Sequence, residues 1–276
     1  MDFIRCLESH GEAEHTRPAG VTAKIIDGAA AVQMKAPRQV KTFGEYSLNI
    51  FRKSIITEID ANGFTRIDVV FDRYMDGSLK SETRERRGKG VRISVQKNTP
   101  IWANWQQFLR EDENKTELFR LLAKDLTMST LPGCIVVTTD LEGVTCSATI
   151  DANSLSPCNH EEADTRIFLH TKHIVECGHR KVVIQTVDTD VVIIGISLFG
   201  QINAEELWIE FGVGKSKRWL PIHRYAASLG DEMCQGLLFW FSFTGCDTVS
   251  AFCGRGKKMA WNTWNIFPDI TETFIR

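Results

Sequence analysis

The chain lacks the cysteine pairs and the complete glycine-rich signature that mark two common kinds of site. Its eight cysteines are scattered, and no CxxC pair occurs among its 276 residues. This spacing excludes the usual zinc motifs and, at this length, speaks against a secreted disulfide framework. The segment FGVGKSKRW resembles a phosphate-binding P-loop, but Ile209 stands where that motif needs its first glycine. The expected location is therefore the reducing interior of a cell, nuclear or cytoplasmic.

Long apolar runs and a large net charge are also missing. The most apolar stretches, VVIIGISLFG and GLLFWFSF, are shorter than the roughly 20 residues that span a bilayer. The N-terminus has no apolar core with a cleavage pattern, so no signal peptide is expected. The formal net charge is -2, so no global basic field points to nucleic acid. We expect a soluble protein without a membrane partner, in which any nucleic-acid contact depends on local basic patches.

Strand-like and helix-like segments alternate along the chain. Apolar runs such as KIID, VVFD and KVVIQTVDTDVVII read as strands, whereas FGEYSLNIFRKSIITEI has its apolar residues at helical spacing. This alternation predicts an α/β fold with a mostly parallel central sheet flanked by helices on both faces. Residues 1–20 are polar and are expected to form a flexible tail, and residues 21–276 to form a single domain that is helical from Ile222 onward.

Acidic residues stand where the predicted strands end. Asp27 and Asp72 close two of them, and Asp188 and Asp190 lie two apart in a third, where an extended chain would point both to one face. Further acids open a predicted helix or follow a glycine in a turn: Glu161, Glu162, Asp164 and Asp247. Each one alone can be explained as a helix cap or a turn residue.

The joint pattern is harder to explain by structure alone. Sites in open α/β sheets form beyond the carboxyl ends of the strands, where the connecting loops converge. Carboxylates gathered there would repel one another unless cations held them, and oxygen-only clusters favour hard ions such as Mg²⁺ or Mn²⁺. Two such ions can activate a water and stabilise the leaving oxygen in phosphodiester cleavage.

The acidic motifs, in this order, resemble the flap-endonuclease (XPG-type) branch of the PIN-like nuclease superfamily. The matching stretches are IIDG, VVFD with a later LKS, EAD, VDTD, and TGCD with GRGKK, across about residues 22–265. The resemblance implies a three-layer PIN-like fold that cleaves DNA or RNA with two ions, Mg²⁺ or Mn²⁺. It also implies seven carboxylate ligands: Asp27, Asp72, Glu162, Asp164, Asp188, Asp190 and Asp247. In the family, the group that comes first in the sequence mainly binds one ion, and the group with the Asp-x-Asp pair, here Asp188 and Asp190, binds the other.

The EAD motif raises a geometrical question. Glu162 and Asp164 are two residues apart, so a regular helix would point them in different directions, whereas Glu161 and Asp164 share a face better. Either the helix is not yet regular at Glu162, or one of the three acids does not bind an ion directly.

Basic residues are concentrated between residues 80 and 92, where KSETRERRGKGVR has six Lys or Arg against two Glu. A solvated basic loop or a nuclear-localisation patch would have the same composition. The resemblance instead implies a helical gateway that grips the scissile phosphate, with Lys80 and either Arg84 or Arg87 as catalytic cations.

Two more segments follow from the same resemblance. Residues 73–157 correspond to an insertion or arch-like region, and residues 244–276 to a helix-hairpin-helix-like segment. The turn of that segment is expected to bind a duplex phosphate through backbone N–H groups and nearby cations: Gly254, Arg255, Gly256, Lys257 and Lys258.

Two other functions stay open. VDTD resembles the nucleophile motif of haloacid-dehalogenase-type phosphatases, with Asp188 attacking phosphorus, but this leaves Asp27, Asp72 and Asp247 unexplained. A catalytically inactive PIN-like module that binds nucleic acid or protein would not need seven acids. His170 and His173 lie three apart on a predicted helix, and a packed helix face is expected there rather than a metal site.

Overall fold

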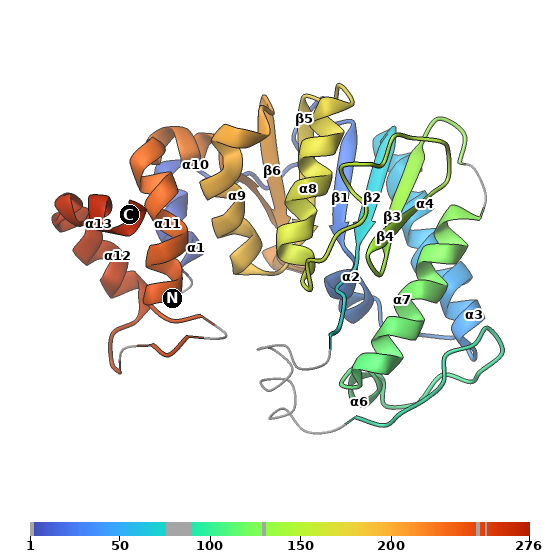
Figure 1. Cartoon of the computed structure of the whole chain (residues 1–276). Helices are drawn as coiled ribbons and strands as arrows, with labels where there is room; N and C mark the ends of the chain where they lie inside the picture. The colour runs from blue at the N-terminus through green and yellow to red at the C-terminus, as the bar shows by residue number, and fades with distance from the viewer. Residues whose placement is uncertain (1–2, 76–89, 129–130, 247–248, 252) are drawn as a thin grey trace. The chain divides into compact units, whose positions relative to one another are not determined.

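The computed structural model describes residues 3–75, 90–128, 131–246, 249–251 and 253–276. The chain divides into two compact units. The larger unit comprises Val21–Ile174, and the smaller unit comprises Met1–Gly20 together with Val175–Arg276. Figure 1 labels the elements of both, and each unit is described by itself.

The larger unit contains a mixed sheet whose described strands have the order β4-β3-β2-β1. Strand β2 pairs in parallel with both β1 and β3, and β4 runs antiparallel to β3 as the second strand of a hairpin. Residues in β1 and β2 are almost entirely buried, including the charged Lys24, Arg66 and Asp68. The strand bounds are β1 (Ala23–Asp27), β2 (Arg66–Val70), β3 (Ile135–Asp140) and β4 (Gly143–Cys146).

Helices cover both faces of this sheet. On one face, Lys24 of β1 pairs with Glu58 of α4 at 3.0 Å. On the other, Asp68 of β2 pairs with His170 of α8 at 2.6 Å, as the alternation of side chains along a strand requires. The helical bounds are α2 (Gly28–Met34), α3 (Phe43–Glu45), the π-helical η2 (Tyr46–Arg52), α4 (Lys53–Asn62), α6 (Trp105–Phe108), α7 (Asp112–Thr127) and α8 (Ala163–Glu176).

The smaller unit combines three described strands in the order β5-β6-β7 with a group of helices. Strand β5 is parallel to β6, and β7 returns antiparallel to β6 after the GVGKS turn. The bounds are β5 (Lys181–Thr186), β6 (Glu206–Phe211), β7 (Arg218–Pro221), α1 (Ile4–Leu7), η1 (Glu8–His10), α9 (Thr189–Ile202), η3 (Gly214–Ser216), α10 (Ile222–Leu229), α11 (Asp231–Phe243), α12 (Lys257–Ile266), η4 (Pro268–Ile270) and α13 (Thr271–Ile275).

The start of the chain differs from the expected flexible tail. Ile4–Leu7 form helix α1, and Phe3, Ile4 and Leu7 are buried. The Phe3 ring lies 5.0 Å from that of Trp240 and 5.4 Å from that of Trp261, centroid to centroid. The prediction is therefore wrong for this segment, because three apolar side chains among polar neighbours are enough to anchor it in an aromatic core.

The apolar run after VDTD is a helix and not the continuation of a strand. Strand β5 ends at Thr186, and α9 begins at Thr189 with Asp188 as its N-cap. A run such as VVIIGISLF is compatible with either state, since a helix that is apolar on most sides can be buried. The aspartate cap decides between them, and the predicted strand over VVII is wrong.

Candidate active site

Asp72 ties the end of β2 to the start of α8 in the larger unit. Its Oδ1 accepts the backbone N–H of Ala163 at 2.9 Å, and its Oδ2 accepts the hydroxyl of Tyr74 at 3.2 Å. The backbone N–H of Arg73 also donates to the carbonyl of Glu161 at 2.7 Å. Because the EAD motif surrounds Ala163, these bonds hold Asp72 beside two other predicted ligands.

The EAD motif has the local geometry that the spacing left open. Helix α8 begins at Ala163, so Glu162 lies just before the helix and Asp164 in its first turn. A regular helix therefore does not force their side chains apart. Glu161, Glu162 and Asp164 are all partly exposed.

Asp27 lies at the same edge of the sheet. In the parallel pairing of β1 with β2 it stands opposite Val70, two residues before Asp72. Its Oδ1 accepts the N–H of Ala30 at 2.9 Å and so caps α2. Gly28 packs α2 closely against the neighbouring loop, because a Cβ there would stand 2.3 Å from the Phe71 ring. The larger unit thus collects Asp27, Asp72, Glu162 and Asp164 at one edge.

The acids of the smaller unit stand at the N-terminus of α9. Asp188 accepts the N–H of Asp190 at 2.9 Å, and its own N–H donates to the Thr186 hydroxyl at 3.1 Å. The expectation that both aspartates share a face of an extended strand is wrong, because the strand has already ended. They instead lie on the cap and first turn of a helix, where the helix dipole favours negative charge.

Lys257 is a half-buried cation of the smaller unit. Burial lowers the pKa of Lys257, whereas Cys246 and Asp190 act in the opposite direction. Asp247 itself lies outside the described residues, directly after Cys246.

The Lys257 ammonium points to the end of α11. It donates to the carbonyl of Phe241 at 2.5 Å and to the hydroxyl of Thr244 at 3.1 Å, and it lies 3.5 Å from the centroid of the Phe241 ring. A cation at a helix C-terminus and over an aromatic face stabilises the packing there. Lys257 is one of the predicted phosphate-binding residues, and in this structure its ammonium is bonded to the end of α11.

The other residues of the predicted phosphate-binding turn lead into α12. Gly256 is the N-cap of this helix, and the residues around it are exposed. Arg255 contacts the sulfur of Met259 at 3.1 Å. The exposed residues of this set are Gly254, Arg255, Gly256 and Lys258.

Lys80, Arg84 and Arg87, the predicted catalytic cations, lie outside the described residues. The chain on either side of them is described. The Tyr74 hydroxyl is bonded to Asp72, and Gly90 lies so close to the end of α6 that a Cβ would stand 2.7 Å from the Gln107 carbonyl oxygen. Farther on, Asn114 of α7 accepts the N–H of Ile93 at 2.9 Å and donates to the carbonyl of Val91 at 2.7 Å.

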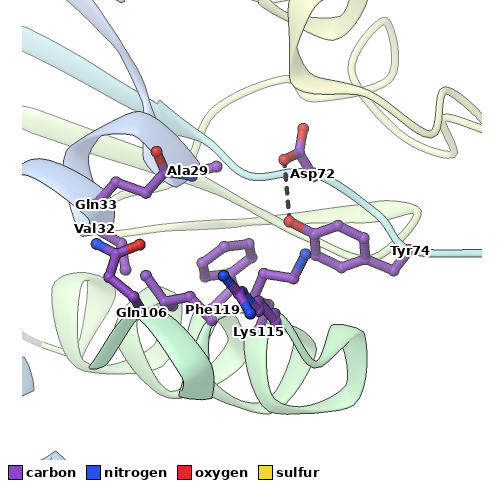
Figure 2. A pocket seen from close by; sticks show the side chains of 10 residues that line it. Ala29, Val32, Gln33, Asp72, Tyr74, Gln106, Lys115 and Phe119 are labelled. Atoms are coloured by element: carbon purple, nitrogen blue, oxygen red, sulfur yellow. Dashed lines mark hydrogen bonds between the residues drawn. The ribbon is translucent and has the colours of Figure 1, made fainter. Parts of the chain in front are cut away.

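A pocket of about 250 Å³ lies beside Asp72, within the larger unit. In Figure 2, Asp72 and Tyr74 lie at one end and Gln33 and Gln106 at the other, with Phe119 and Lys115 between them. No local pattern predicts this pocket, because α2, the loop after β2, α6 and α7 contribute residues far apart in the sequence. The lining consists of Ala29, Val32, Gln33, Asp72, Tyr74, Gln106, Leu109, Arg110, Lys115 and Phe119.

The donor chemistry at the strand ends fits a hard divalent ion. The acids are partly exposed oxygen donors, but Asp72 and Asp27 already accept bonds from the chain. Across the part of the chain that the structure describes, no three His, Cys, Asp or Glu side chains form a group able to hold a metal. Asp247 lies outside that part. Ion binding would therefore require some of the present carboxylate contacts to be exchanged for metal contacts.

The histidines of α8 take structural roles, as predicted. His170 is fully buried and hydrogen-bonded to Asp68, which also receives two bonds from Arg66, at 2.8 and 3.0 Å. His173 bonds the carbonyl of Asp151 through Nε2 at 2.6 Å. These side chains tie α8 to the sheet and to the loop before it.

Comparisons with known proteins find relatives in structure only. No protein-family model matches the sequence, and no curated protein matches it. The catalytic core of Rad2 in complex with DNA substrate matches with a TM-score of 0.54 and 14% identity over 96% of this chain and 67% of that chain. A second Rad2–DNA complex matches with a TM-score of 0.52 and 15% identity, over 96% of this chain and 68% of that chain. Flap endonuclease-1 from Methanococcus jannaschii matches with a TM-score of 0.44 and 14% identity, over 92% of this chain and 73% of that chain.

The two Rad2 comparisons establish the fold. The predicted α/β class, and the resemblance in fold to flap-endonuclease-like nucleases, are confirmed. At this level of identity the likeness is one of architecture. None of the helices in the described ranges is long and apolar enough to cross a membrane.

Proposed function

We propose that the protein is a divalent-metal-dependent phosphodiesterase that cleaves DNA or RNA. The observation that supports this most is the placement of Asp27, Asp72, Glu162 and Asp164 at one edge of a sheet with the fold of a nuclease core. Asp27 and Asp72 also cap or tie elements of the fold, but those roles do not account for Glu162 and Asp164 at the same edge. Carboxylate oxygens are the ligands that Mg²⁺ and Mn²⁺ prefer in hydrolytic sites.

In this proposal each group of acids serves one ion. Asp27, Asp72, Glu162 and Asp164 hold the first, and Asp188, Asp190 and Asp247 hold the second. When bound, such ions supply an activated water and stabilise the charge on the leaving oxygen. The chain's own part is to keep the carboxylates at the strand ends: Asp72 is bonded to the start of α8 and Asp188 to the start of α9, and an ion would replace some of these bonds.

Cations complete the proposed site. Lys80 and either Arg84 or Arg87 would neutralise the phosphate that is cleaved, since positive charge close to it stabilises the transition state. The exposed start of α12, with Gly254, Arg255, Gly256 and Lys258, would contact the nucleic-acid backbone at a distance from the cleaved bond. The helix-hairpin-helix character of residues 244–276 remains part of the proposal.

The test is a cleavage assay with end-labelled flap and hairpin substrates of DNA and of RNA. We expect cleavage in Mg²⁺ or Mn²⁺ and none in EDTA. Binding that persists in EDTA, with no cleavage at any metal concentration, would instead identify a non-catalytic binding module. Hydrolysis of p-nitrophenyl phosphate without nucleic-acid cleavage would favour the phosphatase alternative with Asp188 as nucleophile.

A further inference from the structure

The C-terminal helices of the smaller unit, α11, α12 and α13, carry a concentration of exposed apolar side chains (Figure 1). Of the sixteen large apolar side chains that are exposed among the described residues, nine lie between residues 238 and 275. Single exposed apolar residues are normal, but a group of them marks an interaction surface. The nine are Leu238, Phe239, Phe243, Val249, Met259, Ile266, Phe267, Ile270 and Ile275.

Five of these side chains are continuous with one another. The rings of Phe239 and Phe243 are stacked with their centroids 5.9 Å apart. Phe243 in turn lines a hollow of about 420 Å³, together with the other members of the set and with the buried Trp240 and Trp264. We call this surface the α12 patch, and it consists of Phe239, Phe243, Met259, Phe267 and Ile270.

The α12 patch has the size expected of the apolar core of a protein interface. Its five side chains are 42–62% exposed. They therefore leave on the order of 400–600 Å² of apolar surface in water, if a large side chain offers about 150–250 Å². A standard interface buries about 800 Å² on each partner, of which about 60%, or about 500 Å², is apolar. One protein partner of ordinary contact size would therefore cover the patch.

Opposite charges stand at the two ends of α12. Arg255 precedes the helix, where its guanidinium contacts the sulfur of Met259 at 3.1 Å, and Asp269 follows the helix in η4. Among the described residues, neither charged side chain has an ionic partner. Their placement also opposes the helix dipole, which favours an anion at the N-terminus and a cation at the C-terminus. A partner that brings an acid to the start of α12 and a base to its end would correct both.

We propose that this partner is a second copy of the chain, with the two α12 helices packed antiparallel across a two-fold axis. The ten residues of α12 rise about 15 Å, so the second copy places its Asp269 beside Arg255 and its Arg255 beside Asp269. Ile266, which is 69% exposed at the end of α12, then faces the hollow of the other copy. A two-fold contact repeats every pairing, so a surface that carries both members of each pair can bind itself.

This inference goes beyond the nuclease proposal and does not depend on it, since dimerisation needs neither nucleic acid nor a metal ion. In the dimer, Arg255 is engaged by the second copy. The residues that remain for a nucleic-acid backbone at the start of α12 are then Gly254, Gly256 and Lys258. A nucleic acid is less suited to the α12 patch itself, because Asp269 would repel its phosphates.

Sedimentation equilibrium in EDTA, without nucleic acid, tests the proposal. We expect wild type at micromolar concentration to have twice the 31.2 kDa mass of the chain and to dissociate on dilution. Arg255→Asp and Asp269→Arg each place like charges opposite one another at two symmetric positions. Each should weaken dimerisation at least about tenfold, as expected when like charges are brought together across an interface.

A mixture of these two variants is the decisive sample. When one copy carries Arg255→Asp and the other Asp269→Arg, both contacts again join an acid to a base. The mixed dimer should therefore form with about the affinity of wild type. Native mass spectrometry, with a mass tag on one variant, distinguishes it from either dimer of identical copies. A folding defect in the single variants could not produce this rescue.

The apolar contact is tested with Phe267→Ala, which should weaken dimerisation at least about tenfold, as for a central aromatic side chain of an interface. The matched controls are Trp102→Ala for the aromatic change and Arg38→Asp for the charge reversal. Both positions are exposed in the larger unit and should leave the dimer unchanged. Urea unfolding of every variant confirms that the fold is intact.

The outcomes are independent of nuclease activity. A wild-type protein that stays monomeric at every concentration would overturn the proposal and leave the α12 patch to a different protein. A dimer that none of the three patch variants weakens, or variants that form no mixed dimer, would show that the antiparallel α12 contact is wrong. Cleavage by wild type would be compatible with each of these results, so the two proposals fail separately.

Discussion

At the scale of the residue, the buried carboxylate of Asp68 is stabilised by hydrogen-bonding partners from β2 and α8. Asp68 and His170 are both fully buried, and Arg66 supplies two hydrogen bonds to the same carboxylate. The sequence shows Asp68 only as an acid inside an apolar strand, without its partner. Nothing in the local pattern connects it to a histidine 102 positions away, so this ion pair could not be predicted.

The same cluster makes stability depend on pH. Burial lowers the pKa of His170 from 6.5. Among the described residues, its Nε2 has no hydrogen-bond partner, so a proton there would be buried and unsatisfied. Burial by itself raises the pKa of Asp68, but the bonds and charges of His170 and Arg66 lower it overall. Both shifts mean that the unfolded chain binds more protons than the folded chain as the solution becomes acidic.

We therefore expect the free energy of unfolding to be highest above about pH 6.5 and to fall as the pH decreases below it. His170→Asn keeps a donor towards Asp68 and removes the titrating ring, so it should reduce the slope between about pH 7 and about pH 5. Urea unfolding monitored by circular dichroism measures this. The control is His15→Asn, at an exposed position. Equal slopes in wild type and His170→Asn would contradict the account.

At the scale of the element, the caps position the site. Asp27 ends β1 and caps α2, and Asp188 caps α9 after β5. The sequence predicts the position of these aspartates at strand ends, because the apolar runs before them are clear. It does not predict how VDTD is divided between strand and helix, since the following apolar residues suit both.

Gly28 tests how closely α2 must approach the site. A Cβ at this position would overlap the Phe71 ring, which is held in turn by Phe51 and Phe119. We expect Gly28→Ala to lower the free energy of unfolding by about 1–3 kcal/mol, as for overpacking, because α2 must shift.

The matched control for Gly28→Ala is Gly200→Ala. Gly200 lies in α9, and a Cβ added there would have no neighbouring atom within 4 Å. The substitution should therefore stabilise the protein by about 0.5–1 kcal/mol through helix propensity. Urea unfolding midpoints of both variants distinguish steric overlap from propensity. A Gly28→Ala variant as stable as Gly200→Ala would show that the contact with Phe71 is not tight.

At the scale of the whole molecule, the alternation of elements predicted the fold class, and the order of acidic motifs predicted the resemblance to nuclease folds. Both are confirmed. The ligand set and the catalytic cations remain predictions, since Asp247, Lys80, Arg84 and Arg87 lie outside the described residues. Long-range packing accounts for the surprises: Phe3 in an aromatic core, Lys257 on the end of α11, and the pocket assembled from α2, α6 and α7.

The measurement that tests the central claim most directly is the single-turnover cleavage rate in Mn²⁺ of one variant from each acidic group. Asp72→Asn removes a charge in the larger unit. Asp188→Asn does so in the smaller unit while keeping an equally good helix cap. Asp231→Asn, in the first turn of α11, is the matched control.

We predict that each of the first two variants is folded and cleaves at least about 100-fold more slowly than wild type, as expected when an ion ligand is lost. The control should cleave at the wild-type rate. Full activity in Asp72→Asn and in Asp188→Asn would contradict the two-ion site and return these aspartates to the role of helix and loop caps.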